Sequence, residues 1–348
     1  MIIPHSRPLI DAEDIKTVSD VLASGMIAQG ENVREFEAKM AEFVGVKYAV
    51  AVSSGTTAIH VALASIGVKK GDEVIMPSYV CSSPYMATLH AGAVPQIVDI
   101  DTSDYNINVQ AITENITNKT EAIIVPHMFG TPAELNELLE LGVPIIEDCA
   151  QALGAEYKGK KVGSRGLASV FSFYATKMIT TGEGGMVLTD DTEVYRLAKE
   201  LREYDGRSLD IARYNYKMTD IEAALGLSQL RKLGYFVERR RQIAAKYSEI
   251  LEENGFKIPK IESYKKSVFY RFILLTEKLE QLRSLMKEMG VTCERPVSYP
   301  LHSSLSSVIC PNADYVFRRA LSVPLYPSMT DEEANRVNQS LEFALRQL

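Results

Sequence analysis

Short apolar runs alternate with helix-like segments through the first half of the chain. Each run is long enough for a strand, and the stretches between the runs carry the apolar spacing or the start signals of helices. This alternation is typical of a mostly parallel sheet that is covered by helices on both faces. We therefore expect an α/β fold around seven strands, at residues 48–52, 73–76, 95–99, 122–126, 144–147, 170–173 and 186–188.

The pattern changes beyond about residue 251. The remaining elements are expected as a strand at 269–275, a helix at 279–289, a proline-bounded loop at 296–302 and a last helix at 331–345. We interpret this part as a smaller α+β domain. The expected division is a large domain at 1–238 and a small C-terminal domain at 239–348.

Composition and charge exclude several classes of partner. The 348-residue chain has a formal net charge of −7, and binding to a nucleic-acid backbone needs a basic face, so nucleic acid is not expected. Its four cysteines are scattered without a C-x-x-C pair, which argues against a disulfide framework and a metal site and fits a reducing compartment. No stretch approaches the roughly 18 apolar residues of a membrane helix. We expect a cytoplasmic protein with no membrane partner.

A basic cluster closes the strongly amphipathic segment 221–236. Arg239, Arg240 and Arg241 follow one another there, directly after Glu238. Charge runs on a helix usually face solvent or another subunit. We expect a solvated or interface face at this place rather than a ligand site.

A small polar loop separates the first expected strand from the helix that follows it. The loop is Ser53-Ser54-Gly55-Thr56-Thr57, and the helix is expected at 58–66. Capping of a helix needs only one such hydroxyl residue. A run of four, at a helix N-terminus with free backbone N–H groups, makes phosphate binding at least as good an interpretation. No Gly-Lys-Ser/Thr follows, so the loop is not a Walker motif.

The stretch from Glu147 to Thr189 carries the chemistry. Asp148 ends one apolar run, and Lys177 follows the next run just before the glycine-rich sequence at 182–185. Alone, the acid would be read as a buried strand residue and the lysine as a solvated one. Together, an acid and an amine at two strand ends are what a Schiff-base enzyme needs.

Six stretches resemble, in order, the DegT/DnrJ/EryC1/StrS sugar aminotransferases. They are SSGTTAIHVAL, MPSYVCSS, IIEDCAQALGAEYKGKKVG, FSFYATKMITTGEGGMV, YNYKMTDIEAALGLSQL and LSVPLYPSMTDEE. These enzymes have fold type I of the transferases that depend on pyridoxal 5′-phosphate (PLP). The resemblance covers essentially the whole chain and implies this fold and this cofactor.

The resemblance also implies roles for single residues. Lys177 matches the lysine that forms the internal aldimine and later carries a proton between Cα and C4′. Asp148 matches the carboxylate that keeps the pyridine nitrogen protonated. Gln151 is placed on the cofactor near its ring hydroxyl. The phosphate would be bound by Gly55, Thr56 and Ser172.

Further positions concern the partner subunit and the substrate. Asn215 matches an asparagine that reaches the phosphate of the neighbouring subunit's cofactor, which implies a homodimer with shared active sites. Cys81 stands where many members place an aromatic residue over the cofactor ring. His302 matches a histidine near the sugar nucleotide, and Arg7 and Gln29 are expected to border the substrate.

The expected function is transfer of an amino group from L-glutamate to a keto-sugar, through the pyridoxamine phosphate form of the cofactor. The resemblance favours a nucleotide-linked 4-keto-6-deoxyhexose as acceptor. Two alternatives stay open. One is an aminotransferase for a non-nucleotide keto-sugar or a cyclitol ketone. The other is a regulatory or binding protein that has a PLP-type fold without turnover.

Overall fold

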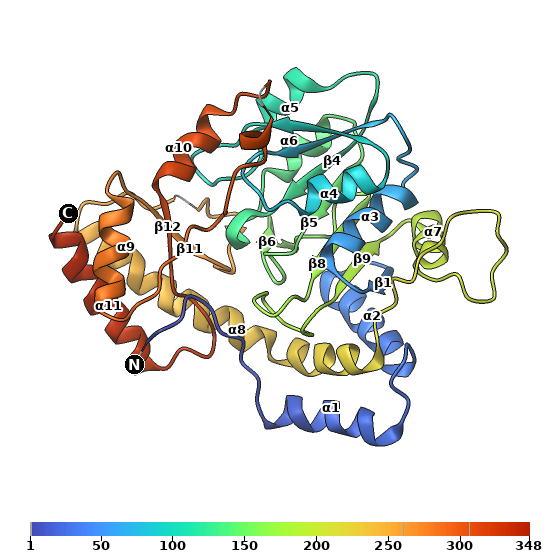
Figure 1. Cartoon of the computed structure of the whole chain (residues 1–348), viewed down its shortest axis with the longest axis horizontal. Helices are drawn as coiled ribbons and strands as arrows, with labels where there is room; N and C mark the ends of the chain where they lie inside the picture. Colours follow the sequence, from blue (N-terminus) through green and yellow to red (C-terminus); the bar gives the residue numbers. More distant parts are fainter. Residues whose placement is uncertain (1, 260, 306) are drawn as a thin grey trace.

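A twisted seven-stranded sheet forms the centre of the computed structural model, which describes residues 2–259, 261–305 and 307–348 (Figure 1). The strands lie in the order β1-β9-β8-β5-β4-β2-β3. Their bounds are β1 Tyr48–Val52, β2 Glu73–Pro77, β3 Val94–Val98, β4 Thr120–Pro126, β5 Ile145–Asp148, β8 Ala168–Ser172 and β9 Gly185–Thr189. The expected α/β fold with a mostly parallel sheet is confirmed.

One strand of the sheet, β9, is antiparallel to the others. β9 runs antiparallel to both of its neighbours, β1 and β8, whereas the pairs from β8 to β3 are all parallel. Parallel strands need a crossover connection, and helices provide it between most of these strands. The carboxyl ends of β1, β2, β4, β5 and β8 therefore meet at one edge of the sheet, where ligands bind in such folds.

Helices cover both faces of the sheet. Apolar side chains of α3, α4 and α7 pack on one face, and those of α2, α5, α6 and α8 pack on the other. Alternation along β1 supplies both cores, with Val50 and Val52 on the first face and Ala49 and Ala51 on the second. The helices are α1 Ala12–Ser24, α2 Glu31–Val44, α3 Gly55–Ser65, α4 Ser83–His90, α5 Val109–Asn115, α6 Leu135–Glu140 and α7 Thr192–Arg202.

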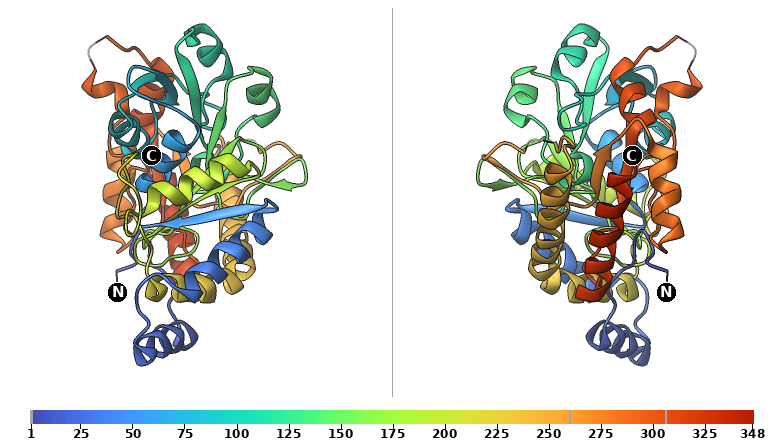
Figure 2. Two further views of the ribbon diagram at one scale, coloured as in Figure 1. Left: turned by 90° about the vertical axis from the view of Figure 1, so that its right-hand side faces the viewer. Right: turned by 90° about the vertical axis from the view of Figure 1, so that its left-hand side faces the viewer.

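A 34-residue helix, α8 (Asp220–Glu253), links the sheet to the C-terminal part of the chain. Figure 2 shows α11 beside the C-terminal half of α8, and the two helices are in contact. A two-stranded sheet of β11 and β12 completes this part. Its elements are β11 Phe272–Leu275, α9 Leu279–Glu288, η2 Leu301–Ser304, α10 Pro311–Arg319, β12 Ala320–Val323 and α11 Asp331–Arg346.

The division between a large and a small domain at residue 238 stays a prediction. α8 passes through this position without interruption. Ile3, from the other end of the chain, lies in the apolar core of the C-terminal part and bridges to Val291. None of the described helices combines the length and the apolarity that are needed to cross a bilayer.

One expected strand has other bounds in the structure. The strand expected at 269–275 begins only at Phe272, because Phe269 adopts a left-handed backbone conformation (φ 48°) that ends an extended run. A small sheet of β10 (Lys265–Lys266), β6 (Glu156–Tyr157) and β7 (Lys160–Lys161) precedes this point and was not expected. A short 3-10 turn, η1 (Met128–Gly130), follows β4.

The arginine cluster on α8 is not a solvated face. Arg240 is 2% exposed, and its Nη1 donates to the carbonyl oxygens of Leu325 at 2.7 Å and Tyr270 at 3.2 Å. Arg239 donates to the carbonyl oxygen of Met329, and Arg241 to that of Ser267. The cluster instead holds α8 to the C-terminal part, because a buried guanidinium is retained only where acceptors surround it.

Candidate active site

The polar loop after β1 forms the first turn of α3. The side chain of Ser54 caps the helix by accepting a hydrogen bond from the amide of Thr57 at 3.1 Å. Gly55 and Thr56 occupy the first two helical positions, where no carbonyl of the helix can accept their amide hydrogens. Two amides at the positive end of an eleven-residue helix therefore remain for an anion.

Close backbone contacts explain two glycines near this loop. A Cβ atom at Gly55 would lie 2.7 Å from Cβ and 3.0 Å from Oγ of Ser172, which ends β8. A Cβ atom at Gly185 would lie 2.2 Å from the carbonyl oxygen of Ser54. Glycine at both positions lets the strand ends β8 and β9 lie directly against the first turn of α3. The hydroxyl of Ser172 is thereby placed beside the anion-binding amides.

Asp148 lies at the carboxyl end of β5 and is 6% exposed. Its Oδ1 accepts a hydrogen bond from the amide of Ala150 at 3.0 Å. Burial raises the pKa of Asp148, and the amide of Ala150 and the charge of Lys177 only partly oppose this effect. A buried carboxyl group with a raised pKa is stabilised as an anion when a cation lies beside it, and a protonated ring nitrogen is such a cation.

A buried pair supports this strand end from behind. His127 Nε2 lies 3.1 Å from Oε2 of Glu147, the residue before Asp148. The carboxylate of Glu147 also accepts hydrogen bonds from the amides of Gly163, Arg165 and Gly166. Burial raises its pKa, but the hydrogen bond and charge of His127, with the amides of Gly163 and Gly166, outweigh burial and lower it. With Cys149, the pair has the composition of a metal site. The carboxylate is already surrounded by hydrogen-bond donors, which indicates a structural role for the pair.

Lys177 lies in the loop between β8 and β9. Two hydrogen bonds pin this loop, one from the amide of Phe173 to the carbonyl oxygen of Gly184 and one from Thr181 back to Phe173. The amide of Lys177 itself donates to the carbonyl oxygen of Tyr174 at 2.9 Å. The ε-amino group lies over the ring of Tyr270, 5.4 Å from its centre. The loop thus presents the amine from a fixed backbone.

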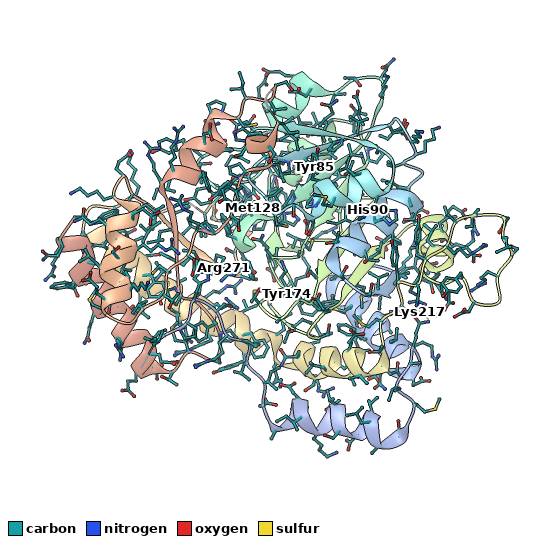
Figure 3. All side chains as sticks on the ribbon, viewed as in Figure 1. Tyr85, His90, Met128, Tyr174, Lys217 and Arg271 are labelled. Carbon is teal, nitrogen blue, oxygen red and sulfur yellow. The ribbon has the colours of Figure 1, made fainter. Side chains whose placement is uncertain are left out.

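One cavity of about 290 Å³ brings most of the expected site residues together. This volume is close to the lower end of the range for small-molecule sites. Tyr174, labelled in Figure 3, also lines the cavity and is 47% exposed. The expected residues that line it are Gly55, Thr56, Cys81, Asp148, Ser172 and Lys177. The anion-binding turn, the buried carboxylate and the amine therefore share one cavity, and their chemistry fits the phosphate, ring nitrogen and aldehyde of PLP.

Gln151 and Asn215 are not among the residues that line this cavity. Oε1 of Gln151 accepts a hydrogen bond from the amide of Phe129 at 2.9 Å, which leaves its Nε2 as a donor. Asn215 is exposed, whereas its neighbours Tyr214 and Tyr216 stack on each other with ring centres 4.7 Å apart. The side chain of Asn215 is therefore open to solvent beside this pair of rings.

The three expected substrate residues do not line the cavity. Nη2 of Arg7 donates to both carboxylate oxygens of Glu333, at 3.1 and 3.0 Å. His302 is 8% exposed, and its Nδ1 lies 2.5 Å from Oγ of Ser78. Oε1 of Gln29 is buried and has no partner within the part of the chain that the structure describes. A role for these three residues in substrate binding stays a prediction.

The sequence interpretation missed two polar residues that line the cavity, and also Tyr270, which contacts Lys177. Ser83, at the start of α4, lines the cavity, and its Oγ accepts a hydrogen bond from Thr56 at 3.0 Å. Glu183 lines it from the glycine-rich loop. Both belong to stretches that were singled out, so their motifs were a usable signal. Tyr270 comes from the C-terminal part, and nothing in its local sequence indicates contact with Lys177.

Comparison with known proteins decides the class to which this arrangement belongs. A model of the DegT/DnrJ/EryC1/StrS aminotransferase family matches residues 8–342. The chain belongs to this family. It is 35% identical to the GDP-perosamine synthase of Escherichia coli O157:H7, over 97% of each chain.

Two solved structures of similar proteins share the fold. DesV of S. venezuelae, in complex with a ketimine intermediate, is 29% identical and superposes with a TM-score of 0.92, over 99% of this chain and 100% of that chain. The putative sugar aminotransferase Spr1654 of Streptococcus pneumoniae, in its PLP form, is 25% identical with a TM-score of 0.92, over 100% and 99%. As a member of the DegT/DnrJ/EryC1/StrS family, the chain is an aminotransferase, which confirms the expected enzyme class.

Proposed function

We propose that the chain transfers an amino group from L-glutamate to a keto-sugar with PLP as cofactor, and that the acceptor is a nucleotide-linked 4-keto-6-deoxyhexose. The observation that carries the proposal is the single cavity shared by the first turn of α3, Asp148 and Lys177. A relative that is named a GDP-perosamine synthase, 35% identical over 97% of the chain, supports a sugar nucleotide as acceptor.

The chain offers a group for each part of the cofactor. The amides of Gly55 and Thr56 and the hydroxyl of Ser172 would hold the phosphate. The carboxylate of Asp148 would face the ring nitrogen, and Nε2 of Gln151 would donate to the ring hydroxyl. When bound, PLP supplies an electron-withdrawing ring next to the carbon that loses a proton.

Lys177 has two roles in this proposal. Its neutral amine would attach the cofactor, because only an amine condenses reversibly with an aldehyde. Once the donor has displaced it, the same Nζ would take and return the proton that moves during transamination. Asp148 would keep the ring nitrogen protonated, because removing a buried anion from its cationic partner is costly. Cys81 and Tyr174 would form the wall above the ring.

The active site is proposed to be shared by two subunits. Asn215 is exposed, and the same loop carries Leu209 at 102% and Ile211 at 41% exposure. Exposed apolar side chains around a polar residue are typical of an interface. A second copy of the chain would cover them and receive Asn215 at the phosphate of its own cofactor.

The absorption spectrum of the PLP-loaded protein tests the proposal. We expect a yellow band that is lost when L-glutamate is added, together with release of 2-oxoglutarate. Lys177→Ala should show neither change. If the band returns when a keto-sugar nucleotide is added, the proposed acceptor class is correct. If it returns only with a free keto-sugar or a cyclitol ketone, that compound is the acceptor instead of a sugar nucleotide. If the absorption band of the PLP-loaded protein does not change with any amino acid, the proposed function is contradicted.

A further inference from the structure

Tyr270 contacts the amine of Lys177 from outside the cofactor cavity. Nζ of Lys177 lies 5.4 Å from the centre of the tyrosine ring, which is within the range of a cation–π contact. Tyr270 is 6% exposed and Lys177 is partly exposed, so the ring is desolvated whereas the amine stays within reach of water from the cavity.

The hydroxyl of Tyr270 lies among polar and cationic groups. It is 3.4 Å from Oγ1 of Thr176, the residue before Lys177, and 3.5 Å from Nη2 of Arg271. Burial alone would raise the pKa of Tyr270, but the charges of Lys177, Arg271 and Arg240 outweigh burial and lower the pKa to about 8. The same ring therefore touches the lysine with its face and the lysine loop with its hydroxyl.

The backbone holds Tyr270 at this place with little freedom. A Cβ atom at Gly130 would lie 2.9 Å from the amide nitrogen of Tyr270, so the segment around Tyr270 lies directly on the turn after β4. The amide of Val268 donates to the carbonyl oxygen of Gly130 at 3.0 Å. From the other side, the buried Arg240 donates to the carbonyl oxygen of Tyr270. The ring is thus anchored to the sheet and to α8 at once.

We propose that Tyr270 is a positioning residue for Lys177, which holds the free ammonium group at the edge of the cofactor cavity between the steps of the reaction. The proposal rests on the proposed function for its meaning in catalysis. When the donor displaces the lysine, the neutral amine takes a proton, and the ammonium group that results must stay close enough to return it, although its four-carbon stem allows many rotamers. The ring face favours the protonated amine at one position, and the contact with Thr176 keeps the ring aligned with the lysine loop.

Titration of tyrosines in the cofactor-free protein tests the contact independently of any activity. With tyrosine labelled at Cζ, NMR should show one phenol that titrates near pH 8. This signal should be missing in Tyr270→Phe. In Lys177→Met it should move to higher pH, because a positive charge that stabilises the phenolate is lost. A wild-type protein whose tyrosines all titrate at or above the ordinary range would overturn the proposal, as would an unchanged titration in Lys177→Met.

Kinetics of the half-reaction with L-glutamate test the positioning role. Tyr270→Leu removes ring and hydroxyl and should slow the chemical step by roughly 30-fold. Tyr270→Phe keeps the ring face and should lose only about 3-fold. In both, the KM for glutamate should stay near that of the wild type, since the tyrosine does not touch the donor.

Tyr247→Phe is the matched control. It also removes a buried tyrosine hydroxyl, one that donates to the carbonyl oxygen of Pro324 at 2.8 Å, away from the lysine. The melting curve of Tyr270→Leu shows whether this variant is folded. If it is folded and reacts with L-glutamate as fast as Tyr247→Phe does, the positioning role is wrong. A wild-type protein that ignores glutamate would contradict the proposed function instead, while the titration would still decide the contact.

Discussion

Gly185 and Ser54 approach so closely that a Cβ atom on the glycine would lie 2.2 Å from the serine's carbonyl oxygen. The contact is between backbones, so no rotamer change relieves it. It fixes the start of β9 against Ser54, and the two residues after Ser54, Gly55 and Thr56, carry the amides that face the cavity. The spacing of the glycine-rich sequence is therefore a geometric requirement of the anion-binding turn.

Gly185→Ala should displace this turn and weaken binding of PLP. Overpacking of this kind costs about 1–3 kcal/mol, which corresponds to roughly 5- to 150-fold in affinity if it falls on the bound form. Titration of the cofactor-free protein with PLP measures the effect. Gly234→Ala is the control, because this exposed helical glycine has nothing within 4 Å of an added Cβ and should be neutral or slightly stabilising. Equal PLP affinity of the two variants would contradict the geometric interpretation.

Asp148→Asn should affect stability and catalysis in opposite directions. Its folded-state pKa is raised above the ordinary value of 3.8, so stability is lost as pH rises through the folded pKa. At neutral pH the cofactor-free variant should therefore melt at a higher temperature than the wild type, and the difference should vanish in acid.

In the loaded Asp148→Asn enzyme, the reaction with glutamate should slow by about 10²–10³-fold, because the ring nitrogen loses its anionic partner. Asp99→Asn provides the control. It changes a carboxylate just after β3, at the edge of the sheet, that accepts from the amides of Asn312 and Ala313, and it should leave the chemical step intact. A near-normal rate in Asp148→Asn would remove its proposed role.

Asn215→Ala should weaken cofactor retention if the asparagine acts across a subunit interface. The decisive measurement mixes Asn215→Ala subunits with Lys177→Ala subunits after dissociation and reassembly. Each hybrid dimer would contain one site with both residues intact, so activity should return although neither parent is fully functional. Failure of the mixture to exceed the sum of its parents would argue for a site built from a single chain.

Arg240→Met should destabilise the protein by about 2–4 kcal/mol, because it leaves buried carbonyl oxygens of Tyr270 and Leu325 without their donor. Denaturant unfolding of the cofactor-free protein measures this. Arg239→Met is the comparison, since it removes one hydrogen bond, to the carbonyl oxygen of Met329, and an ion pair with Asp331, whose side chain is 87% exposed, and it should cost about 1 kcal/mol. A similar loss in both variants would mean that burial of Arg240 contributes little.

The sheet could be predicted from the sequence because each buried strand is a short apolar run with a turn after it. Asp148 and Ser54 could be assigned for the same reason, since the ends of parallel strands meet at one edge. The direction of β9 could not be predicted, because an apolar run such as 186–188 reads the same for either direction.

The burial of Arg240 and the contact between Tyr270 and Lys177 could not be predicted, because both depend on contacts between segments that are distant in the sequence. Arg240 reads as part of a charged helix face, and only carbonyl groups from two other segments make it a buried residue. Tyr270 lies in an aromatic stretch, FYRF, that has the pattern of a core strand. Its relation to Lys177 depends on how the C-terminal part docks on the turn at Gly130, which no local pattern encodes.

The uninterrupted course of α8 has a consequence for how the molecule opens. At its first residue, Asp220 accepts hydrogen bonds from the amides of Gly30 and Val33 at the start of α2. Some five turns later Arg240 binds the C-terminal part. The continuous helix α8 therefore links the part of the protein around the sheet and α2 to the C-terminal part. Neither of the two can rotate away from α8 without breaking buried hydrogen bonds. Hydrogen exchange along the middle of α8 should accordingly require cooperative unfolding of the whole chain rather than a hinge motion.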